Sequence, residues 1–93
     1  MITRIVKLHF HANFCSEFEN NFSEFKKVVS SFEGCKSVKL LKSNSIGIYF
    51  TISQWEQESN LDQYRTSETF KEIWNTLKPY FVERAEAWTT QEI

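Results

Sequence analysis

The sequence predicts an α+β fold of the ferredoxin-like, split βαβ type, with elements in the order β-α-β-β-α-α-β. An alternating segment opens the chain, and a long apolar stripe at helical spacing follows it. Near the C-terminus, two short amphipathic segments precede one more alternating segment. We expect a single domain over residues 1–93, because this length leaves no room for a second and the chain contains no linker, low-complexity segment or internal repeat.

The first strand is expected over residues 2–11, ITRIVKLHFH, where apolar and polar side chains alternate. One face, which we expect to point to the core, carries Ile2, Arg4, Val6, Leu8 and Phe10. The other face is mixed and carries Thr3, Ile5, Lys7, His9 and His11.

A long amphipathic helix follows, because apolar residues recur every three or four positions. They form one stripe, made of Phe14, Phe18, Phe22, Phe25, Val29 and Phe32. Gly34 is expected to stop the helix. The helix separates Cys15 from Cys35 by about 24 Å, whereas a disulfide needs Cα atoms within about 7 Å. Two reduced thiols are therefore expected, as in a cytoplasmic protein.

Two strands are expected next, over residues 36–42 and 45–53, joined by a tight Ser-Asn-Ser turn at 43–45. The second of them, SIGIYFTIS, is apolar at nearly every position. Such a pattern is typical of a strand that is covered on both faces.

Two short helices are expected over residues 56–65 and 68–77, on either side of a polar break. Thr66 or Ser67 can cap the second helix by accepting a hydrogen bond from a backbone N–H. Phe70 lies one turn before Trp74 and is expected to be the deeper anchor of the two.

The last strand is expected over residues 82–90, after Pro79 has ended the second short helix. The helices then cover one face of the sheet, and nothing remains to cover the other. That other face is expected to carry Ile5, Tyr49, Thr51 and Trp88, beside Lys7, His9 and Arg84. Because this face is too apolar to meet water, we predict a homodimer whose two sheets pack face to face, about 10 Å apart.

Charge and chain pattern exclude several partners. The net charge is −1 and no basic stripe exists, so nucleic-acid binding is not expected. No segment has the apolar length of a signal peptide or a membrane span, so we expect a soluble cytoplasmic protein without a membrane partner. His9 and His11 supply two ligands where zinc needs at least three, so no metal site is predicted, and we expect them to pair with Glu83 or Glu86 in the dimer interface.

Four stretches resemble a known family: ITRIVKLHF, FEGC before a strand, YFTISQWEQESNLDQYRTSETFKEIW, and KPYFVERAEAWT. They look like the antibiotic biosynthesis monooxygenase family of dimeric α+β barrels, over almost the whole chain. The most specific part is Trp55 at the end of a strand, followed by the S-E-x-F-K pattern of Ser67, Glu68, Phe70 and Lys71. The resemblance implies the fold and the dimeric barrel, but not one activity, because the family includes quinone-forming monooxygenases that use neither metal nor flavin as well as haem-degrading monooxygenases.

The haem-degrading relatives place an Asn, a Trp and a haem-ligating His at three positions that can be compared with this chain. The resemblance puts Val6, Tyr64 and Trp74 at these positions. An indole nitrogen only donates hydrogen bonds and cannot ligate iron. Haem degradation is therefore disfavoured, and no cofactor is expected.

The family has a cavity between the sheet and the short helices, and the resemblance places a ring of apolar residues there. The candidate substrate-binding residues are Val6, Leu8, Phe10, Trp55, Tyr64, Phe70 and Trp74. A large apolar pocket with few polar groups is a common ligand site. Taken singly, each of these residues is also a good core residue.

The resemblance then implies a cofactor-independent monooxygenase that acts on a flat phenolic or quinol-type aromatic compound. No catalytic residue can be named, because Arg4 lies only at the edge of the core face and neither Tyr64 nor Trp74 is a good base near neutral pH. Two alternatives remain open: a dimer that binds an aromatic metabolite without turning it over, and a dimeric scaffold with a filled core.

Overall fold

The computed structural model describes residues 1–93 and confirms the predicted fold class. The elements are β1 (Ile2–His9), η1 (Ala12–Phe14), α1 (Cys15–Ser30), β2 (Cys35–Lys42), β3 (Ile48–Trp55), α2 (Glu58–Arg65), α3 (Glu68–Leu77), η2 (Lys78–Tyr80) and β4 (Glu86–Gln91). The sheet order is β2-β3-β1-β4, and all neighbouring strands are antiparallel. None of the helices has the length and apolar character needed to cross a membrane.

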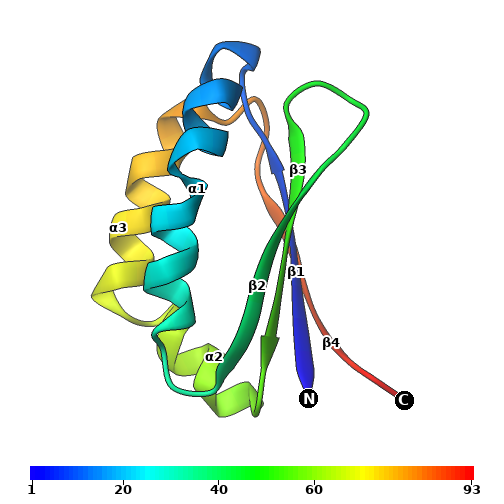
Figure 1. The fold of residues 1–93 in the computed structure, drawn as a ribbon, viewed down its shortest axis with the longest axis vertical. Coiled ribbons are helices and arrows are strands. Elements are labelled where there is room, and N and C mark those ends of the chain that lie inside the picture. The colour runs from blue at the N-terminus through cyan, green and yellow to red at the C-terminus, as the bar shows by residue number, and fades with distance from the viewer.

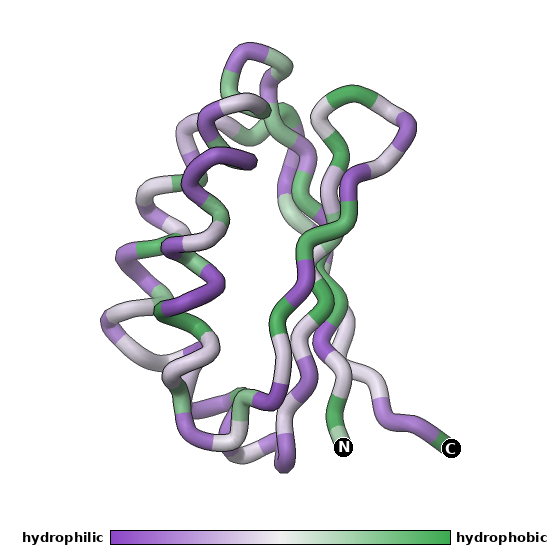
Figure 2. Tube along the Cα trace, in the orientation of Figure 1, coloured by the Kyte–Doolittle hydropathy of each residue, from purple (hydrophilic) through white to green (hydrophobic).

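All three α-helices lie on one side of the sheet, and the other side of the sheet is bare (Figure 1). Figure 2 shows apolar and polar residues interspersed along both the helices and the strands. The alternation of β1 was predicted correctly, since Val6 and Leu8 are buried on the helix side. This arrangement gives a two-layer molecule with one covered and one uncovered sheet face.

The predicted faces of β3 were wrong. Tyr49 and Thr51 were expected on the uncovered face, but they pair with Leu8 and Val6 and so lie on the helix side. Residues directly opposite each other in an antiparallel pair point to the same face. The cause is the composition of the strand: it is apolar on both faces, so its alternation does not distinguish them. The uncovered face instead carries Ile48, Phe50 and Ile52.

The connection between β2 and β3 is longer than the predicted tight turn, and β3 begins at Ile48 rather than at residue 45. Gly47 has φ +89°. The backbone of Phe10 comes close to it, because the Phe10 N–H donates to the Gly47 carbonyl at 2.8 Å. A Cβ at position 47 would collide with the carbonyl oxygen of Phe10. Glycine is therefore required there by both the backbone angle and the close approach.

Other boundaries moved by a few residues. The first strand leaves the ladder after His9, and Phe10 forms an isolated bridge to Phe81. The α2 helix begins at Glu58 and β4 begins at Glu86, both later than expected. The α3 helix has the predicted bounds, and Ser67 caps it by accepting the Phe70 N–H at 3.1 Å.

The core has two buried clusters between the sheet and the helices. The larger contains Val6, Leu8, Phe10, Phe14, Phe18, Tyr49 and Leu77. The smaller contains Ile2, Trp55 and Leu61. Phe70 and Trp74 are both half-buried, and the buried residue of α3 is Leu77, which is 4% exposed. The two cysteines are free, as predicted.

Candidate functional site

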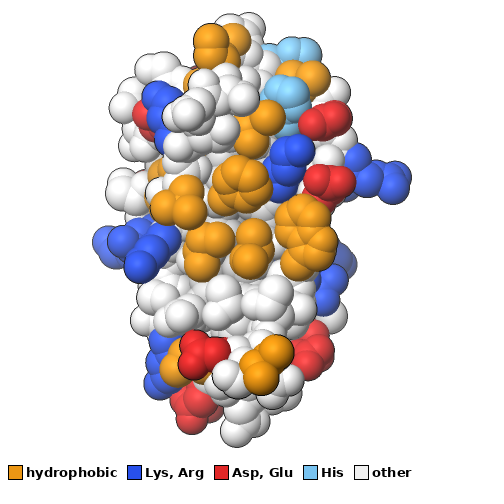
Figure 3. Space-filling view, turned by 90° about the vertical axis from the view of Figure 1, so that its right-hand side faces the viewer, with side chains coloured by type: hydrophobic (Ala, Val, Ile, Leu, Met, Phe, Trp, Pro, Cys, Tyr) orange, Lys and Arg blue, Asp and Glu red, His pale blue; other side chains and the backbone are white.

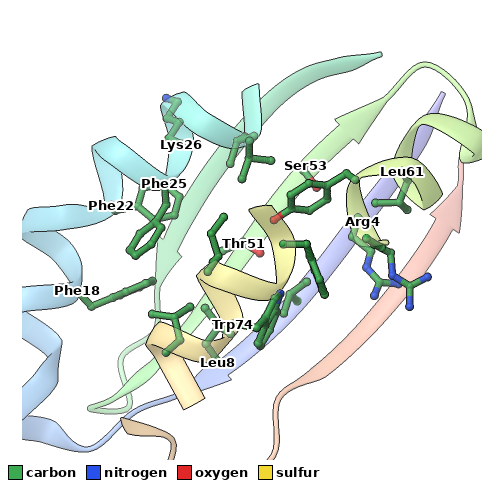
Figure 4. A pocket seen from close by; sticks show the side chains of 18 residues that line it. Arg4, Leu8, Phe18, Phe22, Phe25, Lys26, Thr51, Ser53, Leu61 and Trp74 are labelled. Atoms are coloured by element: carbon green, nitrogen blue, oxygen red, sulfur yellow. The ribbon is translucent and has the colours of Figure 1, made fainter. Parts of the chain in front are cut away.

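A cavity of about 100 Å³ lies between the helix side of the sheet and the three helices (Figure 4). It is lined by 18 residues, of which 13 are hydrophobic. The sheet contributes its floor, which includes Val6, Leu8, Val38, Thr51 and Ser53. The helices contribute the wall, because the apolar stripe of α1 and the inner faces of α2 and α3 all turn toward the same space.

The structure brings most of the predicted binding residues to this cavity. Val6, Leu8, Tyr64, Phe70 and Trp74 line it. Their roles toward a ligand stay a prediction, but their common location follows from the fold.

Phe10 and Trp55, also predicted as binding residues, do not line the cavity. Phe10 is 1% exposed and packs in the aromatic core against Phe14 and Phe18, with ring centroids 5.1 Å and 4.6 Å away. Trp55 is fully buried behind Tyr64, with the two rings stacked at 5.4 Å. Both are aromatic residues whose alternation along the strand places them on the helix side of the sheet, so sequence alone could not distinguish them from residues that line the cavity.

The short helices present a continuous set of aromatic rings to the cavity. Tyr64 meets Phe70 edge-on with centroids 5.2 Å apart, and Phe70 meets Trp74 at 5.6 Å. Trp55 supports Tyr64 from behind, and its indole N–H donates to the Ser53 hydroxyl at 3.0 Å. Aromatic pairs in these geometries stabilise each other beyond simple burial. The wall made by α2 and α3 is thus held by ring contacts that span the break between them.

The charged residues that line the cavity are all cationic: Arg4, Lys26 and Arg65. Figure 4 shows Arg4 and Lys26 on opposite sides of the cavity. Burial lowers the pKa of Arg4, and the positive charge of Arg65 lowers it further, while Asp62 acts in the opposite direction. The cavity is therefore electrostatically suited to a negatively charged ligand.

Sequence reasoning missed this positive lining. The sequence placed Arg4 only at the edge of the core face and indicated no place in the cavity for Lys26 or Arg65. A usable signal was present, since Lys26 directly follows Phe25 and Arg65 directly follows Tyr64. Long cationic side chains beside an apolar stripe can lay their stems along it and bring their charge to a cavity edge.

Tyr64 is the main hydroxyl donor of the site. Burial raises the pKa of Tyr64 to about 12, with a smaller contribution from Cys35. The phenol therefore stays protonated at neutral pH and can donate a hydrogen bond. No His, Asp or Glu lines the cavity, so no side chain in it has an ordinary pKa near neutrality.

The cavity residues do not fit a haem. Trp74, which the family resemblance places at the position of the relatives' ligating histidine, lines the cavity, and neither a His nor a Cys is among the other lining residues. An indole cannot take the place of the missing iron ligand.

The size of the cavity limits what can enter without movement. An apolar cavity of about 150 Å³ in another protein holds one benzene ring. The space here, about 100 Å³, is smaller than that. A flat ligand with one or more rings therefore requires the wall made by α2 and α3 to shift outward.

The two histidines lie away from the cavity. His9 is on the uncovered face, and its Nδ1 lies 2.9 Å from Glu83 Oε1, as predicted for this histidine, whereas His11 pairs with neither Glu83 nor Glu86. This hydrogen bond holds the pKa of Glu83 below its usual value. His11 is exposed, and no group of three or more His, Cys, Asp or Glu side chains that could hold a metal ion is present.

Solved structures share this fold along their whole length. A conserved protein from Methanosarcina mazei Go1 is 23% identical, with a TM-score of 0.87 over 100% of this chain and 94% of its own. A protein from Bordetella bronchiseptica named for the antibiotic biosynthesis monooxygenases is 21% identical, with a TM-score of 0.87 over 99% of this chain and 96% of its own. A protein from Nitrosomonas europaea, named for the same family, is 10% identical with a TM-score of 0.89, covering 100% of this chain and 99% of its own. At these identities the likeness shows the fold alone.

The sequence comparisons give the family. No curated protein matches the chain. The family model described as antibiotic biosynthesis monooxygenase matches residues 1–75, which include the sheet floor and the aromatic wall of the cavity. The chain belongs to the antibiotic biosynthesis monooxygenase family.

Proposed function

We propose that this protein is a cofactor-independent monooxygenase that acts on a flat phenolic or quinol-type aromatic compound bound in the cavity. The observation that carries the proposal is a cavity lined by aromatic rings whose charged lining residues are all cationic. Aromatic walls suit a flat ring. A positive lining favours the ionised form of a phenol, which is the form that gives an electron to O₂.

The reaction balances without a further reductant. A hydroquinone and O₂ give a hydroxyquinone and water: one oxygen atom forms a new C–O bond on the ring, and the other leaves as water. The substrate supplies all the electrons that reduce O₂, and it loses the hydrogens that appear in the water. The protein then has to bind the ring, exclude solvent and stabilise the anion.

The residues for these tasks can be assigned. Phe70 and Trp74 contact the ring, and Tyr64 donates a hydrogen bond to a ring oxygen, since its hydroxyl stays protonated. The positive charge of the lining, to which Lys26 contributes on the side opposite Arg4, lowers the pKa of the bound phenol. The proton leaves to solvent, because no lining side chain is a base near neutral pH.

The proposal includes a homodimer formed through the uncovered sheet face, with residues 1–93 of each copy acting as one domain. Apolar side chains gather over the middle of this face (Figure 3). They include Ile5, Leu41, Ile48, Phe50, Ile52 and Trp88, of which Leu41 and Trp88 are 49% and 47% exposed. Lys7 pairs with Glu86 and His9 is hydrogen-bonded to Glu83 within the chain, which lowers the cost of covering these groups, whereas Lys39 on the same face forms no ion pair. Sedimentation should show about twice the 11.1 kDa monomer, and a monomer at all concentrations would refute this part.

A cytoplasmic location accompanies the proposal. Cys15 and Cys35 are both unpaired, and thiols stay reduced in the cytoplasm.

One observation favours a second candidate function, a dimer that binds an aromatic metabolite without turning it over. The cavity contains no side chain with an ordinary pKa near neutrality that could accept the substrate proton. Such a protein would use the same aromatic wall and cationic lining for binding alone.

Oxygen consumption separates the two functions. The enzyme should consume O₂ with at least one member of a panel of hydroquinones and naphthoquinols, above the autoxidation of each compound alone. A binding protein should leave O₂ uptake at the autoxidation rate while its tryptophan fluorescence is quenched, because Trp74 lines the cavity. A protein that shows neither effect is a scaffold, and both functions are then wrong.

A further inference from the structure

The cationic lining narrows the class of substrate, and this inference rests on the proposed function. We propose that the substrate is an aromatic acid: its ring occupies the aromatic part of the cavity and its carboxylate binds between Arg4 and Arg65. The inference adds a second functional group to the phenol or quinol, and it assigns the residues that select for it.

Arg4 is held at the cavity with most of its hydrogen-bonding capacity unused. It lies on the helix side of β1, directly opposite Ser53 of β3 and Thr89 of β4. Its single side-chain hydrogen bond is the one that Nη1 donates to Thr89 Oγ1 at 2.7 Å. A guanidinium has five N–H donors, so this hydrogen bond orients the group and leaves its other N–H donors free for a ligand.

Arg65 brings a second guanidinium to the same cavity from the last residue of α2. Its only ion pair is with Asp62, one turn earlier, at 4.0 Å between Nη1 and Oδ1. Asp62 does not line the cavity, its side chain is 61% exposed, and a pair of this kind on a helix surface is weak.

Two like charges thus lie at the edge of an apolar space. Arg65 contributes to lowering the pKa of Arg4, so the two groups are within electrostatic range of each other. The protein carboxylate that acts on both is Asp62, but its side chain is 61% exposed and does not line the cavity. Their repulsion is therefore only partly offset in the empty protein, and an anion bound on the cavity side of both groups offsets it further.

A carboxylate fits this position better than a phenol oxygen. A carboxylate is ionised at neutral pH, whereas a free phenol with a pKa near ~10 is neutral. A carboxylate also offers two oxygen atoms, which match the parallel N–H donors of guanidinium groups. Anchoring the carboxylate at this end leaves the ring to lie along Tyr64, Phe70 and Trp74.

The test compares three probes that differ only at one substituent: gentisate, its uncharged amide gentisamide, and hydroquinone, which lacks the substituent. Binding to the full chain is measured by titration calorimetry. Gentisate should bind about tenfold or more tightly than gentisamide, as expected for charge-assisted hydrogen bonds. Raising the salt concentration should weaken gentisate binding and leave gentisamide binding unchanged, because the guanidinium groups are partly exposed.

Three arginines make matched variants available. Arg4→Gln and Arg65→Gln should each weaken gentisate binding about tenfold and leave gentisamide binding unchanged. Arg84 is exposed and does not line the cavity, so Arg84→Gln is the control and should bind gentisate like the wild type. Circular dichroism checks that each variant is folded, and Arg65→Gln, at the exposed end of α2, serves if Arg4→Gln does not fold.

The outcomes separate this inference from the proposed function. If gentisamide and hydroquinone bind as tightly as gentisate, the aromatic cavity stands and the carboxylate site is wrong. The same follows if gentisate binding is equal in wild type, Arg4→Gln and Arg65→Gln. If none of the three probes binds, the cavity is not a ligand site and the proposed function falls together with the inference.

Discussion

Replacing Ser67 by alanine tests how the two short helices are held together. The Ser67 hydroxyl accepts the Phe70 N–H at 3.1 Å and donates to the Tyr64 carbonyl at 2.6 Å, so it joins the end of α2 to the start of α3. Loss of an N-cap of this type costs about 1 kcal/mol. Loss of the second hydrogen bond adds at most about 1 kcal/mol, because the Tyr64 carbonyl still accepts the backbone N–H of Ser67.

We therefore expect Ser67→Ala to lower the free energy of unfolding by about 1–2 kcal/mol. In a domain of this size, each kcal/mol corresponds to a fall in Tm of about 4–8 °C. Urea denaturation followed by circular dichroism measures the effect. Ser67→Asp keeps a side-chain oxygen at the cap and should stay within about 0.5 kcal/mol of the wild type.

Thr76→Ala is a second control, because it removes a hydroxyl that bonds only to the Glu72 carbonyl within α3. A Ser67→Ala variant as stable as the wild type, or a Ser67→Asp variant as unstable as Ser67→Ala, would show that the cap does not hold this segment. The aromatic wall of the cavity would then depend on ring contacts alone.

Three further predictions follow from burial and charge. Leu61→Ala should lower the free energy of unfolding by about 2–5 kcal/mol, because Leu61 is 1% exposed. Phe70→Ala should lower it less, because Phe70 is only half-buried. Equal losses in denaturant titrations would contradict this order. Burial raises the pKa of Tyr64 in the folded protein to about 12, above its ordinary value of about 10, so its contribution to stability is complete below pH 10 and is lost between about pH 10 and 12. Tyr64→Phe should remove this part of the alkaline unfolding and should weaken the binding of hydroquinone. The pKa of Glu19 lies below its ordinary value because its carboxylate accepts the Tyr49 hydroxyl, so its contribution is present above the ordinary pKa and is lost as the pH falls through the folded pKa. Glu19→Gln should make acid unfolding less steep, and an unchanged acid profile would refute the role of this bond.

The sequence predicted correctly those helices and strands whose pattern of apolar and polar residues is consistent with one structure only. The stripe of α1 has a single apolar face, and α3 is bounded by a serine cap and a proline, so both were placed well. The strand β3 is apolar on both faces, and its two sides could not be told apart until its pairing with β1 fixed the register. The start of α2 is marked by a local capping box between Gln57 and Asn60, a signal that was present in the sequence and was not used.

The apolar wall of the candidate site could be predicted from the sequence, but the positive charge of its lining could not. Tyr64 and Trp74 could be placed at the cavity from the family resemblance, whereas Phe10 differs from a lining residue only by the ring contacts around it. That Arg4 and Arg65 line one cavity could be seen only in the structure, because 61 positions of sequence separate them. The packing of α2 over the start of β1 brings them together. Charge at a site of this kind is a property of the assembled structure.

The proposed monooxygenation in the cavity is tested by the transfer of oxygen from isotopically labelled O₂. We expect one labelled oxygen atom in the quinone formed from a quinol substrate and the second in water. A Thr51→Leu variant, whose larger side chain extends into the cavity from β3, should fold normally and lose this transfer. The claim would be contradicted if no label above that of autoxidation reached the product, or if Thr51→Leu transferred labelled oxygen as fast as the wild type.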